Sequence, residues 1–371
     1  MTDSSDTLVS IGDLSVTYRA RLGEVKALTS VELEIPYNNT VAVVGESGCG
    51  KSTLGLTIIR LLPEQASIKS GSIIYKGVNL LEVPEKEFRK YRGTEISMIF
   101  QEPLSSLNPV YTIGEQIQEA LLIRMQREAG EKAYKKEYGP FRYPGNPGLR
   151  ETPLGPSKLV TPLQARKPRF GLKSPELREE IIRLLSLVRI PDPEIVIDRY
   201  PHQLSGGMRQ RIMIAMALAE RPSLLIADEP TTALDVTTQA QVLKLLTDLS
   251  KQTRMSMLLI THDLGIVAEV ADRVSVMYAG TIVEEADVYE LFENPLHPYT
   301  HALLNAIPRG YYDSPPLQTL PGNVPDLVSP PPGCRFHPRC PHAIERCRSE
   351  KPPLIEVKQG HKVACFLYSR R

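Results

Sequence analysis

The first hundred residues contain short segments in which apolar and polar residues alternate. The alternation runs through Leu8–Tyr18, Val25–Ile35 and Gly71–Tyr75, and it predicts antiparallel strands with one buried face. Thr40–Val44 is a short apolar run, and a glycine-rich turn and a helical stretch, Lys51–Leu62, follow it. This order predicts a strand, a loop and a helix in succession.

Strands and helices alternate again after residue 203. The pattern predicts helices over Gly207–Glu220, Thr237–Gln252 and Leu264–Ala271, with buried strands at Leu224–Ala227 and Ser256–Ile260 between them. Such alternation is typical of a mostly parallel sheet with helices on both faces. The chain is therefore predicted to be an α/β protein.

The middle of the chain combines helices with irregular segments. Ser97–Pro109 is predicted to be a loop, and Ile113–Gln126 and Pro175–Val188 are predicted helices. Between these helices lies an insert, about residues 127–174, that is rich in proline, lysine and arginine. Proline at that density favours irregular or extended chain over helix. The insert is either a passive loop or a contact with a partner or a lipid surface.

The glycine-rich turn has the phosphate-binding pattern G-x-x-x-x-G-K-S. Glycines let successive backbone N–H groups point at phosphate oxygens, and the helix N-terminus adds partial positive charge. The lysine is expected to reach the β- and γ-phosphates, and the serine hydroxyl to bind Mg²⁺. The residues predicted to bind the nucleotide are Gly45, Glu46, Ser47, Gly48, Cys49, Gly50, Lys51, Ser52 and Thr53.

Two carboxylates follow the apolar strand Leu224–Ala227, at the strand end where open α/β sheets place ligands. Asp228 is expected to hold Mg²⁺, directly or through water. Glu229 is placed to accept a proton from an attacking water. Together with the glycine loop, these carboxylates predict a P-loop NTPase, a class that includes kinases, GTPases and motors.

A third motif narrows that class, because it resembles the signature motif of the ABC ATPases. In that family Ser205, Gly206 and Gly207 would contact the ATP held by a partner subunit. Taken alone, the same residues are equally consistent with a simple helix cap. The motif is Leu204-Ser205-Gly206-Gly207-Met208-Arg209-Gln210-Arg211.

The resemblance to ABC ATPases continues at single positions. Gln101 matches a glutamine that contacts Mg²⁺, and Asp235 in Ala233-Leu234-Asp235 matches a residue that crosses to the partner's site. Tyr18 matches an aromatic residue that stacks on adenine. His262 matches a histidine that contacts the γ-phosphate, so the resemblance implies ATP hydrolysis with Glu229 and His262 as catalytic residues.

Within the ABC ATPases, the chain is most similar to the D-type ATP-binding subunits of dipeptide and oligopeptide importers. The similarity is carried by Gln203–Leu218, Leu225–Val236, Ser105–Pro109 and Asn294–Thr300. It implies a second related ATPase, two transmembrane permease subunits and an extracytoplasmic substrate-binding protein as partners. Peptides are the expected cargo. Import of nickel or short sugars, and a soluble ABC ATPase without a transport role, are the alternatives.

Four cysteines occur near the C-terminus, in the extension that the resemblance predicts. In some family members this extension carries a 4Fe–4S cluster. Four thiolates suit an iron–sulfur cluster or a tetrahedral zinc ion, and the lack of C-x-x-C pairs favours iron. A metal-free tail or disulfides are the remaining alternatives. The cysteines are Cys334, Cys340, Cys347 and Cys365.

Composition adds limits on partners and compartment. The formal net charge is +1, which gives no broad basic field for nucleic acid. No stretch approaches the roughly 20 apolar residues that a transmembrane helix needs, and the polar N-terminus does not resemble a signal peptide. The chain is expected on the cytoplasmic face of the cell membrane, held there by its permease subunits.

The predicted architecture is an α/β ABC-type P-loop ATPase with an antiparallel β subdomain, a helical subdomain and a small metal-binding C-terminal extension. The nucleotide-binding domain is predicted over residues 1–293, with the helical subdomain at about 102–203. The extension is predicted over residues 294–371.

Overall fold

The computed structural model describes residues 6–21, 23–101, 106–129, 175–232, 234–306 and 322–369. Most of the proline-rich insert lies outside these ranges, as do Ser105 and Ala233 of the quoted motifs. The chain divides into two compact units. One comprises Met1–Glu102 and Arg221–Arg371, and the other comprises Pro103–Glu220.

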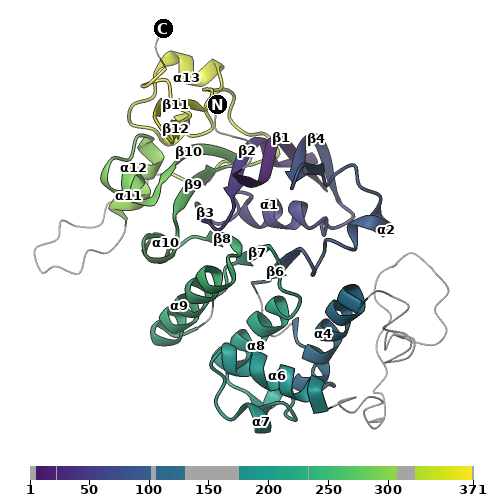
Figure 1. Ribbon diagram of the computed structural model, residues 1–371. Coiled ribbons are helices and arrows are strands. Elements are labelled where there is room, and N and C mark those ends of the chain that lie inside the picture. The colour runs from purple at the N-terminus through teal and green to yellow at the C-terminus, as the bar shows by residue number, and fades with distance from the viewer. Residues whose placement is uncertain are drawn as a thin grey trace, which may run out of the picture. The chain divides into compact units, whose positions relative to one another are not determined.

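The larger unit begins with a four-stranded antiparallel sheet in the order β2-β1-β4-β5. Figure 1 labels β1, β2 and β4 of this sheet. Its strands cover the three segments whose alternation predicted strands, so that prediction is confirmed. The apolar positions Val9, Ile11 and Ile35 face the core and are at most 3% exposed. The bounds are β1 Thr7–Ala20, β2 Gly23–Pro36, β4 Ala66–Tyr75 and β5 Val78–Asn79.

The second sheet of this unit has eight strands in the order β11-β12-β10-β9-β3-β8-β7-β6 (Figure 1). The pairing is parallel between neighbours in the run β9-β3-β8-β7-β6. It is antiparallel between neighbours in the run β11-β12-β10-β9. The predicted mostly parallel core is therefore confirmed. The bounds are β3 Thr40–Val44, β6 Ile96–Ile99, β7 Leu224–Asp228, β8 Ser256–Thr261, β9 Arg273–Tyr278, β10 Thr281–Asp287, β11 Ile355–Lys358 and β12 His361–Val363.

Two local predictions in this unit are wrong. Ser97–Ile99 was predicted to be loop but lies in β6, a strand of four residues that is too short to show a period and gains its partner from β7. The first helix, α1, ends at Ile58 instead of Leu62, because Arg60 adopts a left-handed conformation with φ 52°. Such a residue stops helical hydrogen bonding.

The helices of the larger unit follow its strands and are mostly begun by side-chain caps. Asp235 accepts a hydrogen bond from the Thr238 N–H at 2.9 Å and starts α9, and Asp263 does the same for the N–H of Gly265 at 2.8 Å at α10. The bounds are α1 Lys51–Ile58, α2 Glu85–Phe88, α9 Val236–Thr253, α10 Leu264–Val270, α11 Val288–Glu293, α12 Pro298–Asn305 and α13 Glu345–Ser349.

The C-terminal residues join the main sheet. In β12, Val363 pairs with Glu284 of β10, so the extension continues the main sheet of the larger unit rather than standing apart from it. Three buried rings strengthen this junction: the Tyr299 and Phe336 centroids lie 4.6 Å and 5.1 Å from that of Tyr278 at the end of β9. Aromatic pairs at such distances add to the stability gained from burial.

The smaller unit is helical in its described part. Arg124 of α4 donates to the Ala219 carbonyl oxygen at 2.9 Å and to the Glu180 carboxylate at 3.0 Å, which ties α4 to α6 and to the end of α8. Across the described residues of both units, no helix has the length and apolarity needed to cross a membrane. The bounds are α4 Ile113–Ala129, α6 Pro175–Leu187, α7 Pro193–Val196 and α8 Gly206–Leu218.

Candidate nucleotide site

The loop between β3 and α1 has a backbone that requires glycine at two positions. Gly50 has φ 106°, and a Cβ there would lie 2.5 Å from the Ala27 carbonyl oxygen. A Cβ on Gly45 would lie 2.1 Å from the Met277 carbonyl oxygen. The loop is thus packed closely against β2 and β9, and it leads into a helix whose first N–H groups have no intrahelical acceptor. This arrangement suits an anion.

Lys51 places its ammonium group on this loop. Its Nζ donates to the carbonyl oxygens of Gly45 at 2.8 Å and Glu46 at 3.1 Å, and the residue is only 5% exposed. A full positive charge is therefore held among glycine-rich backbone. Such a site favours a polyphosphate over a neutral ligand.

Ser52 and Asp228 meet beside the loop. The Ser52 hydroxyl donates to Asp228 Oδ1 at 3.0 Å. Burial raises the pKa of Asp228, an effect that the hydrogen bond from Ser52 and the charge of Lys51 only partly oppose. A hydroxyl and a carboxylate side by side supply hard oxygen ligands of the kind that Mg²⁺ prefers.

Glu229 is the centre of a hydrogen-bonded cluster. Its Oε2 accepts from Gln101 Nε2 at 2.9 Å and from the Thr232 hydroxyl at 3.0 Å, and its Oε1 lies 3.0 Å from His262 Nδ1. Burial alone would raise the pKa of Glu229, but the hydrogen bonds and charge of His262, with Thr232 and Lys51, lower it overall. The carboxylate is ionised at neutral pH and can accept a proton.

The backbone at Glu229 explains how these groups meet. Glu229 follows β7 directly and has φ 45°, a conformation that is unusual for a residue with a side chain. Its N–H donates to the Ile260 carbonyl oxygen of β8 at 2.8 Å, which fixes the turn. Because His262 follows β8, the turn brings the ends of two adjacent parallel strands into one cluster.

Tyr18 and Cys49 also lie at the loop. The Tyr18 hydroxyl is 3.1 Å from the Thr53 hydroxyl, so the structure places this β1 residue beside the first turn of α1. Cys49 is 1% exposed, and burial raises the pKa of its thiol. The thiol is neutral and packs the loop from inside. Ser47 and Gly48 form the exposed tip of the loop.

The signature residues lie in the other unit. The Ser205 hydroxyl accepts from the Met208 N–H at 3.3 Å, so Ser205 caps α8, and Gly206 and Gly207 begin that helix. Asp235 is an exposed helix cap in the larger unit. In the larger unit the structure brings together Lys51, Ser52, Asp228, Glu229, Gln101 and His262 at the strand ends next to the loop.

The four C-terminal cysteines line one small cavity, together with His337, His342 and Phe336. Burial raises the pKa of the Cys334 thiol to about 11 and raises the pKa of Cys340 and Cys365 as well. Within the part of the chain that the structure describes, however, no three His, Cys, Asp or Glu side chains are arranged to hold a metal ion. The structure therefore does not bear out the predicted metal-binding character of the extension.

Sequence reasoning missed two parts of the site. Thr232 lies three residues after Glu229, and its hydroxyl is a hydrogen-bond donor that local spacing could have suggested. Contacts from Tyr299 and Arg339 to Glu46 are also present. No local sequence pattern predicts these contacts, because Tyr299 lies 253 positions and Arg339 lies 293 positions from Glu46.

Comparison with known proteins agrees with this geometry. Residues 28–232 match the family described as ABC transporter, and residues 283–347 match the family described as the oligopeptide/dipeptide transporter C-terminal region. The oligopeptide transport ATP-binding protein AppD of Bacillus subtilis is 44% identical over 363 residues, covering 98% of this chain and 97% of AppD. The dipeptide transport ATP-binding protein DppD of Escherichia coli is 40% identical over 358 residues, covering 96% of each.

Solved structures share the fold. A dimeric ATP-binding cassette, MJ0796, in a post-hydrolysis state with ADP and Pi, superposes with a TM-score of 0.57 at 24% identity, covering 76% of this chain and 98% of that one. The cbiO1 protein of Clostridium perfringens, part of an ABC transporter complex, gives a TM-score of 0.56, also at 24% identity, covering 78% of this chain and 92% of its own. At this identity the likeness concerns the fold.

Proposed function

The chain belongs to the ABC transporter family as an ATP-hydrolysing subunit, and we propose that it powers the import of dipeptides or oligopeptides. The observation that carries the ATPase role is the cluster of Glu229 with Gln101 and His262 next to the Lys51 loop. Support for peptides as cargo comes from relatives named for oligopeptide or dipeptide transport, which align over 96% or more of the chain. It also comes from the matching C-terminal region.

We propose the following roles for the site residues. Lys51 and the backbone of Gly45–Thr53 bind the phosphates of ATP, and Tyr18 stacks on the adenine. Ser52, Asp228 and Gln101 would hold Mg²⁺, which would supply positive charge to the phosphoryl group that is transferred. Glu229 accepts a proton from the attacking water, and His262 contacts the γ-phosphate.

A single chain supplies only part of the closed site in this proposal. Ser205, Gly206 and Gly207 of one ATPase subunit bind the ATP of its partner, and Asp235 crosses to the partner's site. ATP then favours the closed pair, and hydrolysis removes the contact that held it closed. We propose a second, related ATPase as this partner, with two permease subunits that hold the pair at the cytoplasmic face of the membrane.

Isolation of the assembly from native membranes in mild detergent tests the importer role. We expect a tagged chain to recover a second ATPase, two integral membrane subunits and a binding protein loaded with peptide. The Lys51→Ala variant is the control, because it alters the nucleotide loop and is expected to keep the same partners. Recovery of soluble partners alone would contradict the importer, whereas nickel or a short sugar in the binding protein would contradict the peptide cargo.

For the extension, we propose that Cys334, Cys340, Cys347 and Cys365 hold a 4Fe–4S cluster. The four thiols line one cavity, and four thiolates are the ligand set of such a cluster. Bound iron would deprotonate the thiols and cross-link a segment with a small apolar core.

Metal analysis of the chain purified without oxygen checks this cluster. We expect about four irons per chain, the content of one such cluster, and loss of most of this iron in Cys365→Ser. Cys49→Ser is the matched control and is expected to keep its iron, because Cys49 lies in the nucleotide loop. Stoichiometric zinc, or no metal in the anaerobic preparation, would show that the cluster assignment is wrong.

A further inference from the structure

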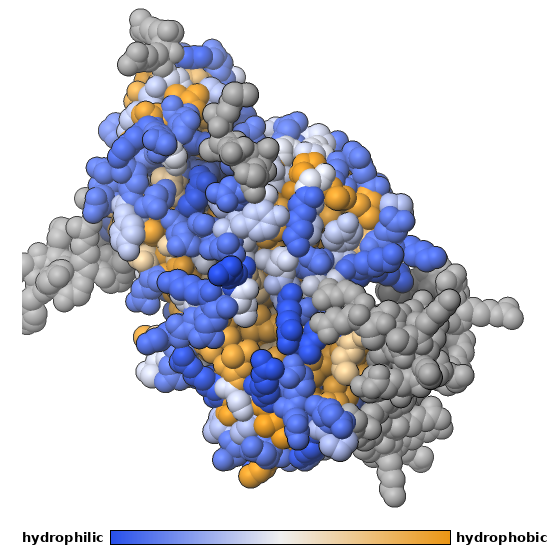
Figure 2. Space-filling model, viewed as in Figure 1, coloured by the Kyte–Doolittle hydropathy of each residue, from blue (hydrophilic) through white to orange (hydrophobic). Residues whose placement is uncertain are grey.

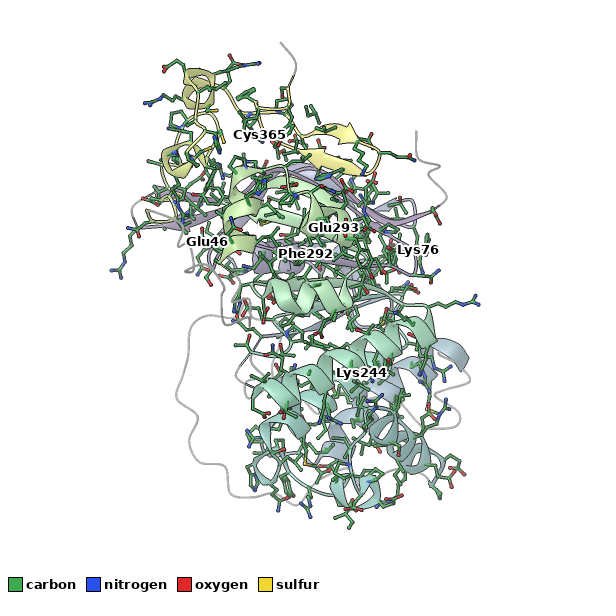
Figure 3. All side chains as sticks on the ribbon, turned by 90° about the vertical axis from the view of Figure 1, so that its left-hand side faces the viewer. Glu46, Lys76, Lys244, Phe292, Glu293 and Cys365 are labelled. Carbon is green, nitrogen blue, oxygen red and sulfur yellow. The ribbon has the colours of Figure 1, made fainter. Side chains whose placement is uncertain are left out.

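An ion pair joins the nucleotide loop to the C-terminal extension. Both carboxylate oxygens of Glu46, the second residue of the loop, accept from the Arg339 guanidinium, at 2.7 Å from Nη1 and 3.0 Å from Nη2. Such bidentate pairing fixes the orientation of the two side chains as well as the distance between them. The Glu46 side chain is 26% exposed and that of Arg339 only 6%. Figure 3 labels Glu46 and, in the C-terminal extension, Cys365.

Two buried tyrosines, one in β9 and one in the extension, hold the two partners of this ion pair. Arg339 Nη1 also lies 3.4 Å from the Tyr278 hydroxyl, and the guanidinium carbon lies 5.8 Å from the centroid of the Tyr278 ring. Tyr299 belongs to the same ring cluster, and its hydroxyl accepts from the Glu46 N–H at 2.9 Å. The extension thus holds Glu46 by its backbone and by its side chain.

Glu46 places a negative charge in the loop that we propose binds the phosphates of ATP. Its carboxylate carries the same sign of charge as the phosphates of ATP, so an unpaired Glu46 would weaken nucleotide binding. Its carbonyl oxygen also accepts from Lys51 Nζ at 3.1 Å, so a shift of Glu46 moves the anchor of that ammonium group. One guanidinium offsets the charge and fixes the position.

We infer that Arg339 is a positioning residue for the nucleotide site, acting through Glu46, and that the extension is part of the ATP-binding apparatus. This inference rests on the proposed function of the loop. It assigns the extension a second task besides any metal binding: without Arg339, the loop retains its glycines and its lysine but presents an uncompensated negative charge to ATP.

Calorimetric titration of the purified full-length chain with ATP and Mg²⁺ tests the inference. We expect Arg339→Ala to weaken ATP binding about tenfold, because the negative charge of Glu46 is then no longer offset and repels the phosphates through a partly solvated medium. The double variant Glu46→Gln/Arg339→Ala should bind within about twofold of Glu46→Gln alone, because no unpaired charge is left for Arg339 to offset. Arg339→Lys should lie between Arg339→Ala and the parent.

A control substitution separates this effect from general damage to the extension. Lys358→Ala removes a surface ion pair in which Nζ of Lys358, in β11, lies 2.7 Å from Oε2 of Glu290, in α11. We expect this variant to leave ATP affinity unchanged. Unchanged affinity in a folded Arg339→Ala would overturn the inference, as would a loss that Glu46→Gln does not restore. If Arg339→Ala does not fold, rescue of folding and affinity in the double variant supports the inference and its absence contradicts it. Failure of the unaltered chain to bind ATP would instead refute the proposed function.

Discussion

Glu229→Gln is expected to bind ATP and Mg²⁺ with near-normal affinity and to hydrolyse ATP about 10²–10⁴ times more slowly, the usual effect of losing a positioned general base. The amide keeps an oxygen that can accept from Gln101 or Thr232, so the local structure should persist. It cannot take a proton from water at neutral pH. The measurement is steady-state phosphate release beside equilibrium ATP binding.

Two further observations belong to this prediction. With hydrolysis blocked and binding intact, ATP should trap a closed pair of subunits, visible as a stable larger species in gel filtration. Glu293→Gln provides the control, because Glu293 is exposed at the end of α11 and should leave turnover unchanged (Figure 3). If Glu229→Gln hydrolysed ATP within a few-fold of the rate of the unaltered chain, Glu229 would not be the general base.

The parts of the site that sequence predicted are those whose cause is local. In the Gly45–Ser52 loop, Gly48 and Gly50 have φ of 80° and 106°, which favours glycine for the backbone itself, and all five residues of the strand Thr40–Val44 are buried. Asp228 and Glu229 follow a buried strand in a parallel sheet, so their position at its carboxyl end follows from topology. Patterns of this kind can be recognised in the sequence without knowledge of the rest of the chain.

The parts that sequence did not predict depend on distant partners. β6 is a strand because β7 lies beside it, and neither the length of the segment nor the spacing of its apolar residues predicts that pairing. The pair formed by Arg339 and Glu46 joins residues 293 positions apart, which a single sequence cannot connect. The role that we propose for Ser205 requires a second subunit, so the chain alone shows a helix cap there.

The surface gives less guidance than the motifs. Figure 2 shows a face that is largely hydrophilic with smaller apolar patches, as expected for a chain in which 23% of residues are charged. Isolated apolar residues on a surface are normal and identify no partner. The nucleotide site and family membership therefore identify the function, and the surface does not.

Lys51→Ala is expected to abolish ATP binding at concentrations that saturate the unaltered chain. Lys51 is 5% exposed, and its ammonium group is held on the loop by the carbonyl oxygens of Gly45 and Glu46. One charge pair at 4 Å contributes about 4 kcal/mol at an effective dielectric constant of 20, or roughly a thousandfold in affinity. Magnesium and the loop amides remain, but they cannot replace a buried cation.

Thermal unfolding with and without ATP measures this loss on the full-length chain. ATP at a hundred times its Kd stabilises a binding protein by about 2.7 kcal/mol, so the unaltered chain should melt at a higher temperature with ATP and Lys51→Ala should not. Lys244→Ala is the matched control, since Lys244 lies exposed on α9 (Figure 3) and should retain the full shift. An undiminished rise in melting temperature with ATP in Lys51→Ala would mean that ATP binds elsewhere. It would also contradict the roles proposed for Ser52 and Asp228.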